Sequence, residues 1–500
     1  MNELNRLVER FGGALMSPKT DHQTIQITGV QLDSRLVREG DLFVALPGTS
    51  GDGQSYAKQA EANGAVALLL PEGADALDCE LPQWRHSDAR RTAGECASVV
   101  HGEPSLDMEV IAITGTNGKT TTAHMLRSLL GALDPALLGT TGYHLAGDRD
   151  YPASHTTPDA PRLQGLMAEH RQAGGGTLIM EASSHALDQD RLAGTQVDLA
   201  VFTNLSRDHL DYHGDMESYA RAKARLFESL GPDGAAVLNA DDAMYPMMAR
   251  VVRGLGVRIL TTSTQVPADL CATNIETVAS GTRFDLRGLG LNATAAHIPV
   301  LGHHNVSNAL QALACARWLG VSETQLLVDL SNLRSAPGRM ERVSFDSEVG
   351  RSMPHVYVDY AHTPEALEHA LSSLVDVPGA GRVILVFGCG GDRDQGKRKM
   401  MGRVAARLAD RLIVTSDNPR GEDPAVIAEQ IMVGVREQGS PGAYLCYVEL
   451  DRLAAIRMAL EMADPGDLVL IAGKGHENTQ TSAGGVIDFD DRLVAQGLCS

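Results

Sequence analysis

The sequence predicts an α/β protein whose mostly parallel sheets are covered by helices. Short runs rich in aliphatic and β-branched residues alternate with longer helical patterns, and these runs are apolar throughout. Alternation of strand and helix indicates parallel sheets, and a continuously apolar run indicates a strand that is buried on both faces. The clearest strand-like runs lie at 65–70, 110–115, 176–183, 199–204, 356–361, 382–388, 411–416 and 468–473.

A chain of 500 residues predicts three domains at roughly 150 residues each. The first, 1–88, opens with an amphipathic helix that ends at a Gly-Gly pair, and small strands follow near 30–48. The second, 89–336, contains the next apolar runs, and its alternating, polar-rich stretch 262–300 is expected to form an antiparallel excursion. The third, 337–500, begins at a Pro-Gly linker and has its own alternation of strand and helix.

The composition excludes several classes of protein. The formal net charge of −20 argues against a general nucleic-acid binder, because phosphate backbones require a basic face. The chain lacks an apolar run near the roughly 20 residues that span a bilayer, and its first residues lack the apolar core of a signal peptide. The seven cysteines are scattered without a CxxC spacing, so neither a disulfide framework nor a zinc site is indicated, and a reducing cytoplasm is expected.

The pattern of a phosphate-binding loop appears in VIAITGTNGKTTTAHML, which is a buried strand, a glycine-rich turn and a helix. Gly115 and Gly118 let backbone N–H groups approach phosphate oxygens, and the amino terminus of the helix adds a positive dipole end. Lys119 is placed to reach the β- and γ-phosphates, and Thr120 is placed to hold Mg²⁺ through its hydroxyl. The combination predicts nucleotide binding.

Two further polar residues follow predicted strands, and a third lies on a predicted helix. Glu181 ends one strand and His209 follows another, at the carboxyl edge of a parallel sheet, where ligands bind. A carboxylate and an imidazole are candidate ligands for Mg²⁺ bound to a triphosphate, although imidazole is an unusual ligand for this ion. Lys223 lies in the helical segment ESYARAKARLFESL, and by sequence alone it is expected on a solvated helix face.

The loop GTNGKTT (115–121) resembles the ATP-binding loop of the Mur ligases and of the related folylpolyglutamate synthetases. The resemblance to the Mur ligases extends over nearly the whole chain, and its motifs are specific. They are DSR (33–35), TTPDA (156–160), EASSHALDQDR (181–191), TNLSRDHLDYHG (203–214), GHHNVSN (302–308), GRMERV (338–343), DYAHTPEAL (359–367), FGCGGDRDQGKRKMM (387–401), DNPRGEDP (417–424) and GKGHE (473–477).

The resemblance implies an ATP-dependent, Mg²⁺-requiring acid–amino-acid ligase of peptidoglycan precursor synthesis in the cytoplasm. The implied reaction joins meso-diaminopimelate to the γ-carboxylate of D-glutamate in UDP-N-acetylmuramoyl-L-alanyl-D-glutamate, through an acyl phosphate. The three domains are then a small amino-terminal α/β domain that binds the UDP substrate, a central parallel-sheet ATPase domain of the P-loop type, and a Rossmann-like carboxy-terminal domain that binds the amino acid. They are expected to close around the substrates, in a monomer without a membrane span or a nucleic-acid partner.

The resemblance also implies roles for the residues that match family motifs. Catalytic roles fall to Lys119, Glu181, His209 and Lys223. Lys223 is expected to be carbamylated by CO₂, so that it becomes a carboxylate, and the metal ligands are then Thr120, Glu181, His209 and the carbamate. ATP is expected to contact Gly115, Thr116, Asn117, Gly118, Lys119, Thr120, Thr121, Asn305, Arg339 and Asp359. The UDP-muramoyl dipeptide is expected to contact Leu32, Ser34, Thr156, Thr157, Ser183, Gln189 and Arg191. Diaminopimelate is expected to contact Arg393, Asp417, Asn418, Pro419, Arg420, Gly473 and Glu477.

The predicted amino-acid specificity depends mainly on Arg420. Diaminopimelate carries a distal carboxylate that lysine lacks, and an arginine fork can hold a carboxylate by two parallel hydrogen bonds. Asn418 is expected to add an amide donor, and Glu477 is expected to accept the distal ammonium. Four residues depart from the family pattern, namely His155, Ala182, His304 and Lys399, and Ala182 in place of a frequent valine is a small change.

Three alternative functions remain open at this point. They are a lysine-adding ligase of the same family, a folylpolyglutamate synthetase, and a nucleotide-driven switch ATPase. The DSR and DNPR motifs speak against the first two. A switch would share the phosphate loop but has no need of the GDRD, DNPR and GKGHE motifs.

Overall fold

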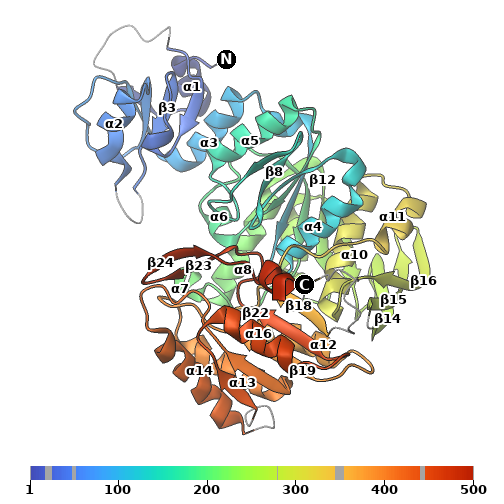
Figure 1. Ribbon diagram of the computed structural model, residues 1–500. Helices are drawn as coiled ribbons and strands as arrows, with labels where there is room; N and C mark the ends of the chain where they lie inside the picture. The colour runs from blue at the N-terminus through green and yellow to red at the C-terminus, as the bar shows by residue number, and fades with distance from the viewer. Residues whose placement is uncertain are drawn as a thin grey trace. The chain divides into compact units, whose positions relative to one another are not determined.

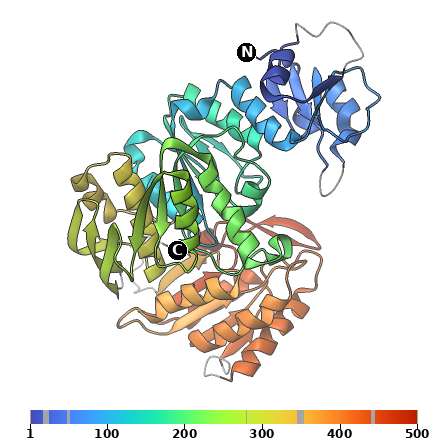
Figure 2. The same ribbon diagram turned by 180° about the vertical axis from the view of Figure 1, so that it is seen from behind.

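The computed structural model describes residues 2–16, 25–47, 52–278, 280–343, 354–439 and 445–498, so that Met1 and Cys499 lie outside the described residues. Figures 1 and 2 show the helices and strands of the chain from two sides. The chain divides into two compact units. The first unit comprises Met1–Thr262 and Ala314–Leu319, and the second comprises Ser263–Leu313 and Gly320–Ser500.

The amino-terminal part of the first unit is a five-stranded sheet in the order β1-β5-β4-β3-β2. Its strands are β1 (Ala14–Met16), β2 (Gly29–Gln31), β3 (Asp41–Val44), β4 (Ala67–Pro71) and β5 (Gln83–His86), and its helices are α1 (Leu4–Phe11), α2 (Ala57–Ala62) and α3 (Ala89–Val100). Neighbouring residues of β3 point to opposite faces: Leu42 packs with α1 and α3, and Phe43 packs with α2. The amphipathic helix predicted at the start of the chain is confirmed as α1.

The rest of the first unit is built on a sheet in which β13, β12, β11, β6, β10 and β7 are parallel neighbours in that order. Strands β8 and β9 then continue it in antiparallel pairing. The strands are β6 (Glu109–Thr114), β7 (Ala136–Gly139), β8 (Gly142–Leu145), β9 (Arg149–Tyr151), β10 (Thr177–Glu181), β11 (Val197–Phe202), β12 (Leu230–Asn239) and β13 (Arg258–Ser263). The helices are α4 (Lys119–Leu129), α5 (Ala160–Gln172), α6 (Ser184–Asp188), α7 (Leu210–His213), α8 (Met216–Ala224) and α9 (Tyr245–Leu255). Because β11, β6, β10 and β7 are adjacent and parallel, the loops that follow them share one edge of the sheet.

The second unit begins with three antiparallel strands, β14 (Leu270–Val278), β15 (Gly281–Gly288) and β16 (Leu291–Ile298). The antiparallel excursion predicted for 262–300 is therefore confirmed. The helices α10 (His303–Trp318) and α11 (Glu323–Leu330) follow, and α11 packs on β16.

The carboxy-terminal part of the second unit is a sheet in the order β17-β18-β22-β19-β20-β21, in which only β17 is antiparallel to its neighbour. Its strands are β17 (Glu341–Arg342), β18 (His355–Asp359), β19 (Val383–Phe387), β20 (Arg411–Val414), β21 (Cys446–Val448) and β22 (Leu468–Ala472), with a hairpin of β23 (Thr479–Ser482) and β24 (Gly485–Asp488). The helices are α12 (Pro364–Val375), α13 (Gly396–Leu408), α14 (Pro424–Gln438), α16 (Arg452–Met462) and α17 (Asp491–Leu498). Successive residues of β22 face opposite cores: Leu470 packs with α12, α13 and α14, and Ile471 packs with α16 and α17.

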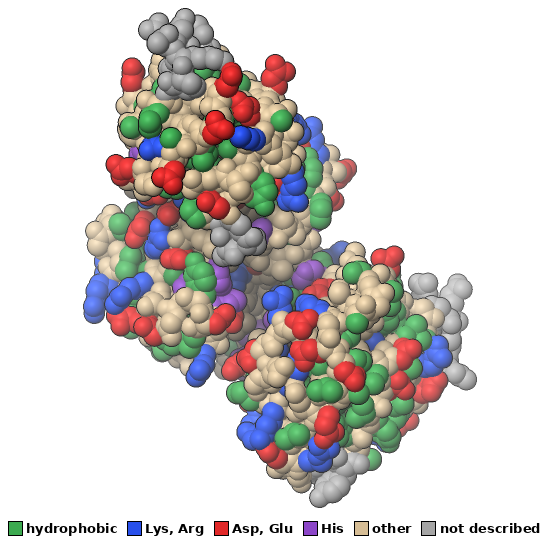
Figure 3. Space-filling model, turned by 90° about the vertical axis from the view of Figure 1, so that its left-hand side faces the viewer, with side chains coloured by type: hydrophobic (Ala, Val, Ile, Leu, Met, Phe, Trp, Pro, Cys, Tyr) green, Lys and Arg blue, Asp and Glu red, His purple; other side chains and the backbone are tan. Residues whose placement is uncertain are grey.

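The predicted α/β fold class is confirmed, because each of the eight apolar runs contains or overlaps a buried strand. The three domain boundaries stay predictions. Among the described residues, no helix combines the length and apolar character needed to cross a membrane. Acidic and basic side chains are interspersed over the described residues of the face shown in Figure 3, so this face offers no continuous basic surface to a nucleic acid.

Candidate active site

The phosphate loop is held tightly between the ends of β6 and β11. Gly115 and Gly118 have φ angles of 150° and 86°, in the region that favours glycine. A Cβ atom on Gly115 would lie 1.8 Å from the Thr203 hydroxyl oxygen, so the close approach of the two strands requires glycine here. The Thr203 hydroxyl donates to the Asn117 carbonyl at 2.6 Å. The loop is therefore fixed in shape, and α4 starts directly after it.

Two lysine ammonium groups converge on one carbonyl oxygen of this loop. Lys119 donates to the carbonyls of Gly115 at 2.9 Å and Thr116 at 3.0 Å. Lys223 donates to the same Gly115 carbonyl at 2.8 Å. Two positive charges beside one neutral acceptor would repel each other, which favours loss of a proton from one of the amines or the approach of an anion such as phosphate.

Lys223 is buried, with 1% of its surface exposed, so the solvated helix face expected from the sequence alone is wrong. Ala220 and Ala224 of α8 pack in the core, and a residue three positions after Ala220 shares its helix face. Burial and, to a smaller extent, the charge of Lys119 hold the pKa of Lys223 well below its ordinary value. A lowered pKa favours the neutral amine that reacts with CO₂.

Glu181, 1% exposed, lies at the end of β10 beside the phosphate loop. Its carboxylate accepts hydrogen bonds from the Thr120 hydroxyl at 2.8 Å and from the Thr140 backbone N–H at 2.9 Å. A buried carboxylate and a hydroxyl are oxygen donors of the kind that Mg²⁺ takes together with substrate phosphates, so these residues fit the ion. Within the described residues, no three His, Cys, Asp or Glu side chains group closely enough to hold a metal by themselves.

His209 lies near two other histidines at the amino end of α7. Its side chain is 48% exposed, and its ring centroid lies 4.8 Å from that of His185. The ring centroid of His213 lies 5.4 Å from that of His185, and its Nε2 atom is 3.0 Å from the Ser184 hydroxyl. Burial is the main cause that lowers the pKa of both His185 and His213, so both imidazoles are neutral near pH 7.

The residues predicted for the muramoyl dipeptide form a connected network. The Thr157 hydroxyl donates to the Glu181 carbonyl at 2.8 Å and accepts from the Ser183 backbone N–H at 3.1 Å. Arg191 donates to the Thr157 carbonyl at 2.8 Å and to the Gln189 side chain at 2.9 Å. The network thus connects these residues to the backbone of Glu181. Thr156 lies beside it, with its hydroxyl 3.3 Å from that of Thr140.

A cavity of about 130 Å³ brings Leu32 of the amino-terminal sheet region together with Gln189 and Arg191. His155, one of the departures from the family pattern, also lines this cavity. Ser34 is 6% exposed, and its hydroxyl donates to the Gln59 side chain at 2.8 Å. Of the two predicted UDP-contacting residues, Leu32 therefore lines a cavity, whereas the Ser34 hydroxyl is hydrogen-bonded within the protein.

Two predicted ATP-contacting residues of the second unit lie next to its carboxy-terminal sheet: Arg339 precedes β17, and Asp359 is the last residue of β18. The Asp359 carboxylate accepts from the backbone N–H groups of Met340 at 2.7 Å and Ala361 at 2.8 Å, and so fixes the segment that carries Arg339. The Arg339 guanidinium lies over the Tyr360 ring at 4.6 Å. Asn305 is buried on α10 and donates to the Leu301 carbonyl at 2.8 Å. The ring centroid of His304 lies 6.0 Å from that of His369.

The predicted amino-acid pocket lies at the carboxyl ends of β20 and β22. The Asn418 amide donates to Glu477 at 2.8 Å. Lys474, which is fully buried, donates to the same Glu477 oxygen at 3.1 Å. Gly473 has a φ of 115°, and a Cβ atom there would lie 3.6 Å from an Asp417 carboxylate oxygen. The structure therefore brings Asp417, Asn418, Gly473 and Glu477 together.

Arg420 and Arg393 lie on the neighbouring loops. Pro419 is buried, and Arg420 adopts a left-handed φ of 51°. The Arg420 guanidinium donates to the Gly391 carbonyl at 2.8 Å, and Arg393 is exposed on the same loop as Gly391. Lys399, another departure from the family pattern, pairs with Glu437 at 2.6 Å.

A buried arginine, Arg398, forms hydrogen bonds with residues of both loops. Arg398, whose side chain is fully buried, holds both carboxylate oxygens of Glu422 at 2.8 Å. It also donates to the Gly390 carbonyl at 3.1 Å. Hydrogen bonds from Arg398 are the main cause that lowers the pKa of Glu422 to about 2. Cys389, on the same loop, is a small buried residue.

Sequence reasoning missed several polar residues that touch the predicted sites. They are Thr140, His185, His213, Arg398, Arg452 and Lys474. Most lie inside motifs that were found, such as Lys474 in GKGHE and Arg398 in GKRKMM. Thr140 directly follows β7, the neighbour of β10. A hydroxyl residue just after an apolar run is therefore the sequence signal that could have placed Thr140 at this edge of the sheet.

Models of known families match most of the chain. The Mur ligase family, catalytic domain, matches residues 26–100; the Mur ligase middle domain matches 113–316; and the Mur ligase, glutamate ligase domain, matches 338–475. Fold, phosphate loop and family models together define an ATP-dependent ligase that forms amide bonds.

Individual relatives agree over nearly full length. A UDP-N-acetylmuramoyl-L-alanyl-D-glutamate–2,6-diaminopimelate ligase of Synechococcus elongatus is 43% identical over 498 residues, which cover 96% of each chain. A protein of the same name from Listeria monocytogenes is 38% identical and covers 99% of this chain and 98% of its own. A solved structure of a ligase with that name superposes with a TM-score of 0.69, at 36% identity and 97% coverage of both chains. The chain belongs to the Mur ligase family.

Proposed function

We propose that this ligase joins meso-diaminopimelate to the D-glutamate γ-carboxylate of UDP-N-acetylmuramoyl-L-alanyl-D-glutamate, at the expense of ATP. The observation that carries the proposal is the mixed charge of the amino-acid pocket. The carboxylates of Asp417 and Glu477 lie beside the Asn418 amide, and Arg420 lies on the same loop as Asn418. A ligand end that carries both an ammonium and a carboxylate matches this set, and relatives named as 2,6-diaminopimelate ligases support the same substrate.

The reaction proceeds in two steps. A γ-carboxylate oxygen of glutamate forms a bond to the γ-phosphorus of ATP while the bond to the ADP oxygen breaks, which gives an acyl phosphate. The amine of the amino acid then attacks the acyl carbon, and phosphate leaves with the bonding electron pair while the amine nitrogen loses a proton. Lys119 stabilises charge on the transferred phosphoryl group, and the fixed loop at Gly115 and Gly118 orients it.

Mg²⁺ would be held by Thr120, Glu181, His209 and a carbamate on Lys223, and when bound it neutralises phosphate charge. The carbamate forms when the neutral Lys223 amine bonds to the carbon of CO₂ and one proton is released. Burial of Lys223 beside the positive Lys119 supports this chemistry, because both favour the neutral amine.

The muramoyl dipeptide would contact the network of Thr156, Thr157, Ser183, Gln189 and Arg191, which leads to Glu181 and so towards the phosphate loop. Leu32 and Ser34 would contact the UDP end. Because its substrates are nucleotide-linked precursors and a free amino acid, we place the enzyme in the cytoplasm. We also expect a monomer, as the resemblance to the Mur ligases implies.

An amino-acid panel assay tests the proposal. Phosphate release from ATP is measured with the UDP-linked dipeptide and, in turn, meso-diaminopimelate, L-lysine and other amino acids. We expect turnover to require both co-substrates and diaminopimelate to be preferred over lysine by about 10⁴-fold in kcat/KM. Lysine incorporation at a rate near that of diaminopimelate would assign the chain to the lysine-adding class, and ATP turnover indifferent to both co-substrates would indicate a switch ATPase.

A further inference from the structure

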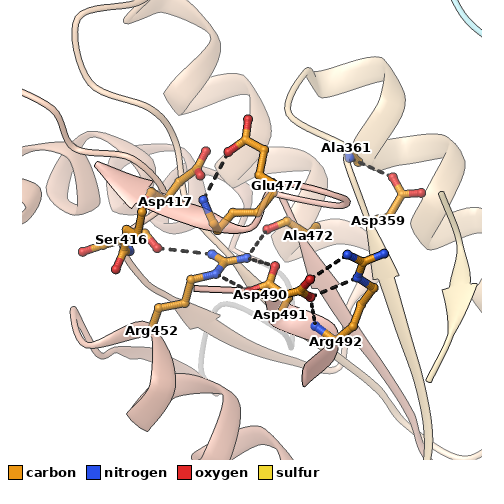
Figure 4. A network of polar contacts seen from close by, with 12 residues as sticks. Asp359, Ala361, Ser416, Asp417, Arg452, Ala472, Glu477, Asp490, Asp491 and Arg492 are labelled. Carbon is orange, nitrogen blue, oxygen red and sulfur yellow. Dashed lines mark hydrogen bonds and ion pairs between the residues drawn. The ribbon is translucent and has the colours of Figure 1, made fainter. Parts of the chain in front are cut away.

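The walls of the amino-acid pocket are loops that leave two parallel strands, β20 and β22, at the carboxyl edge of the sheet, with β19 between them. The loop after β20 contains Ser416 and Asp417. Ala472 is the last residue of β22, and the loop that follows it carries Glu477. Arg452, the first residue of α16, lies between the bases of these two loops (Figure 4). None of the roles described above uses this residue.

Arg452 is bonded to both loops and to one carboxylate. Its guanidinium donates to the Ser416 carbonyl at 3.2 Å and to the Ala472 carbonyl at 3.1 Å. Its Nε and one terminal nitrogen donate to the two oxygens of Asp491 at 2.7 Å each. The side chains of Arg452 and Asp491 are both fully buried. The planar guanidinium fork therefore sets the separation of the two carbonyls as well as that of the helices α16 and α17.

The same guanidinium lies close to the least satisfied carboxylate of the pocket. Asp417 is 7% exposed, and its Oδ1 atom has no hydrogen-bond partner among the residues that the structure describes. Burial raises the pKa of Asp417, and the charges of Arg452 and Lys474 oppose this rise. The unused oxygen is an acceptor that a ligand ammonium can bind, and a bound ammonium would join the cations that favour the ionised form of Asp417.

We propose that Arg452, held in place by Asp491, is a positioning residue for amino-acid recognition. It sets the spacing of the loops after β20 and β22, and it supplies a fixed positive charge beneath Asp417. This inference rests on the proposed function, because it takes the pocket between these loops as the amino-acid site.

Stability alone is a weak explanation for this pair. The cost of desolvating two buried charges offsets most of their attraction, so a buried ion pair is poor evidence for a stabilising role. The same sheet has a second arginine–aspartate pair at the opposite end of its strands, in which the arginine side chain is 32% exposed. Arg382, at the amino end of β19, holds Asp467 at the amino end of β22 through two nitrogen–oxygen contacts of 3.0 and 2.5 Å. That pair joins the same sheet but contacts neither pocket loop.

The test compares Arg452→Lys with the control Arg382→Lys. Each variant keeps its charge and loses the fork. For each, KM values are measured for ATP, for the UDP-linked dipeptide, and for the amino acid that the unaltered enzyme uses best, together with the melting temperature. We expect Arg452→Lys to raise the amino-acid KM about tenfold or more, because small misplacements of binding groups cost that much. The other two KM values should change less than twofold, and Arg382→Lys should leave all three unchanged.

A second variant, Arg452→Met/Asp491→Leu, removes the pair with side chains of similar volume, a replacement that buried ion pairs often tolerate. If it folds, the amino-acid KM should rise at least as much as in Arg452→Lys. An unchanged amino-acid KM in either folded variant would overturn the proposal. Equal increases in all three KM values would also overturn it, as would failure of both variants to fold while Arg382→Lys folds, since Arg452 would then act on stability. If the unaltered enzyme prefers another amino acid, the proposed function fails, but the role of Arg452 is still tested with that amino acid.

Discussion

The phosphate loop and the amino-acid pocket treat charge in opposite ways. At the phosphate loop, Lys119 and Lys223 converge on the neutral carbonyl of Gly115, and the charge of Lys119 helps to lower the pKa of Lys223. In the pocket, buried cations are matched with carboxylates: Arg452 with Asp491, Arg398 with Glu422, and Lys474 with Glu477.

The difference shows what each region needs before it can work. A site that gathers two basic side chains is suited to an anion, and in the proposed mechanism ATP and a carbamate on Lys223 supply the negative charge. A site whose charges are already paired is organised before its ligand arrives, so its geometry can discriminate between ligands. Changes at the first site should therefore abolish chemistry, and changes at the second should alter selectivity or stability.

The largest effect is expected from Lys223→Ala. In the proposed mechanism this change removes a metal-binding carbamate, so kcat should fall by about 10³-fold or more while the melting temperature stays near that of the unaltered enzyme. Steady-state kinetics at saturating Mg²⁺ and thermal unfolding provide the two measurements.

Lys223→Arg is the matched control for this change. Arginine keeps the positive charge but remains protonated and forms no carbamate, so it should be as inactive as alanine. If Lys223→Arg or Lys223→Ala kept most of the activity, the carbamate assignment would be wrong and the residue would act, at most, as a cation.

Glu181→Gln should have the next largest effect. The amide keeps the shape of the side chain but loses the charge that binds Mg²⁺ in the proposed mechanism, so kcat should fall by about 10²- to 10³-fold and the Mg²⁺ requirement should rise. Titration of activity with Mg²⁺ is the measurement, and Thr140→Val, which removes one hydrogen bond to Glu181, is the control with a smaller expected loss. An unchanged Mg²⁺ dependence in Glu181→Gln would remove this residue from the metal site.

Most of the fold could be predicted from the sequence because the strands are buried on both faces. Continuous apolar runs such as 110–115 and 468–473 leave little doubt about strands, and the alternation with helices then fixes parallel sheets. The sequence could not place the strands in their spatial order, because order depends on which helices cross which face.

The candidate site was predictable where a motif carries its own chemistry, as the glycine-rich turn before Lys119 does. It was less predictable where a buried residue supports a loop through hydrogen bonds to the loop backbone. The sequence alone assigned Lys223 to a solvated face, and only the packing of Ala220 and Ala224 shows that it is buried. Arg452 lies in an ordinary helical pattern, and its contacts with Ser416 and Ala472 come entirely from tertiary structure.

Arg420→Ala tests the selectivity of the amino-acid pocket. The loss of a guanidinium that can hold a distal carboxylate should lower kcat/KM for diaminopimelate by about 10²-fold, and the KM for ATP should stay within twofold. Arg420→Lys keeps the charge without the fork and should be intermediate. Competition between diaminopimelate and lysine gives the selectivity directly, and an undiminished preference for diaminopimelate in Arg420→Ala would move the carboxylate contact to another residue, with Arg393 as the next candidate.

The smallest effect is expected from Glu422→Gln, and it concerns stability as a function of pH. Arg398 holds the pKa of Glu422 at about 2 in the folded protein, below its ordinary value of 4.5. A carboxyl whose pKa is depressed by folding stabilises the folded state above its unfolded pKa, and this contribution is lost as the pH falls towards the folded pKa. The unaltered enzyme should therefore melt above Glu422→Gln at pH 6, and the difference should shrink between pH 4.5 and 2, where the carboxyl becomes protonated and resembles the amide. Thermal unfolding of both proteins across this range measures the difference, with Glu437→Gln on the exposed face as a comparison. A difference in melting temperature that stays constant down to pH 2 would show that Arg398 and Glu422 act through packing and not through charge.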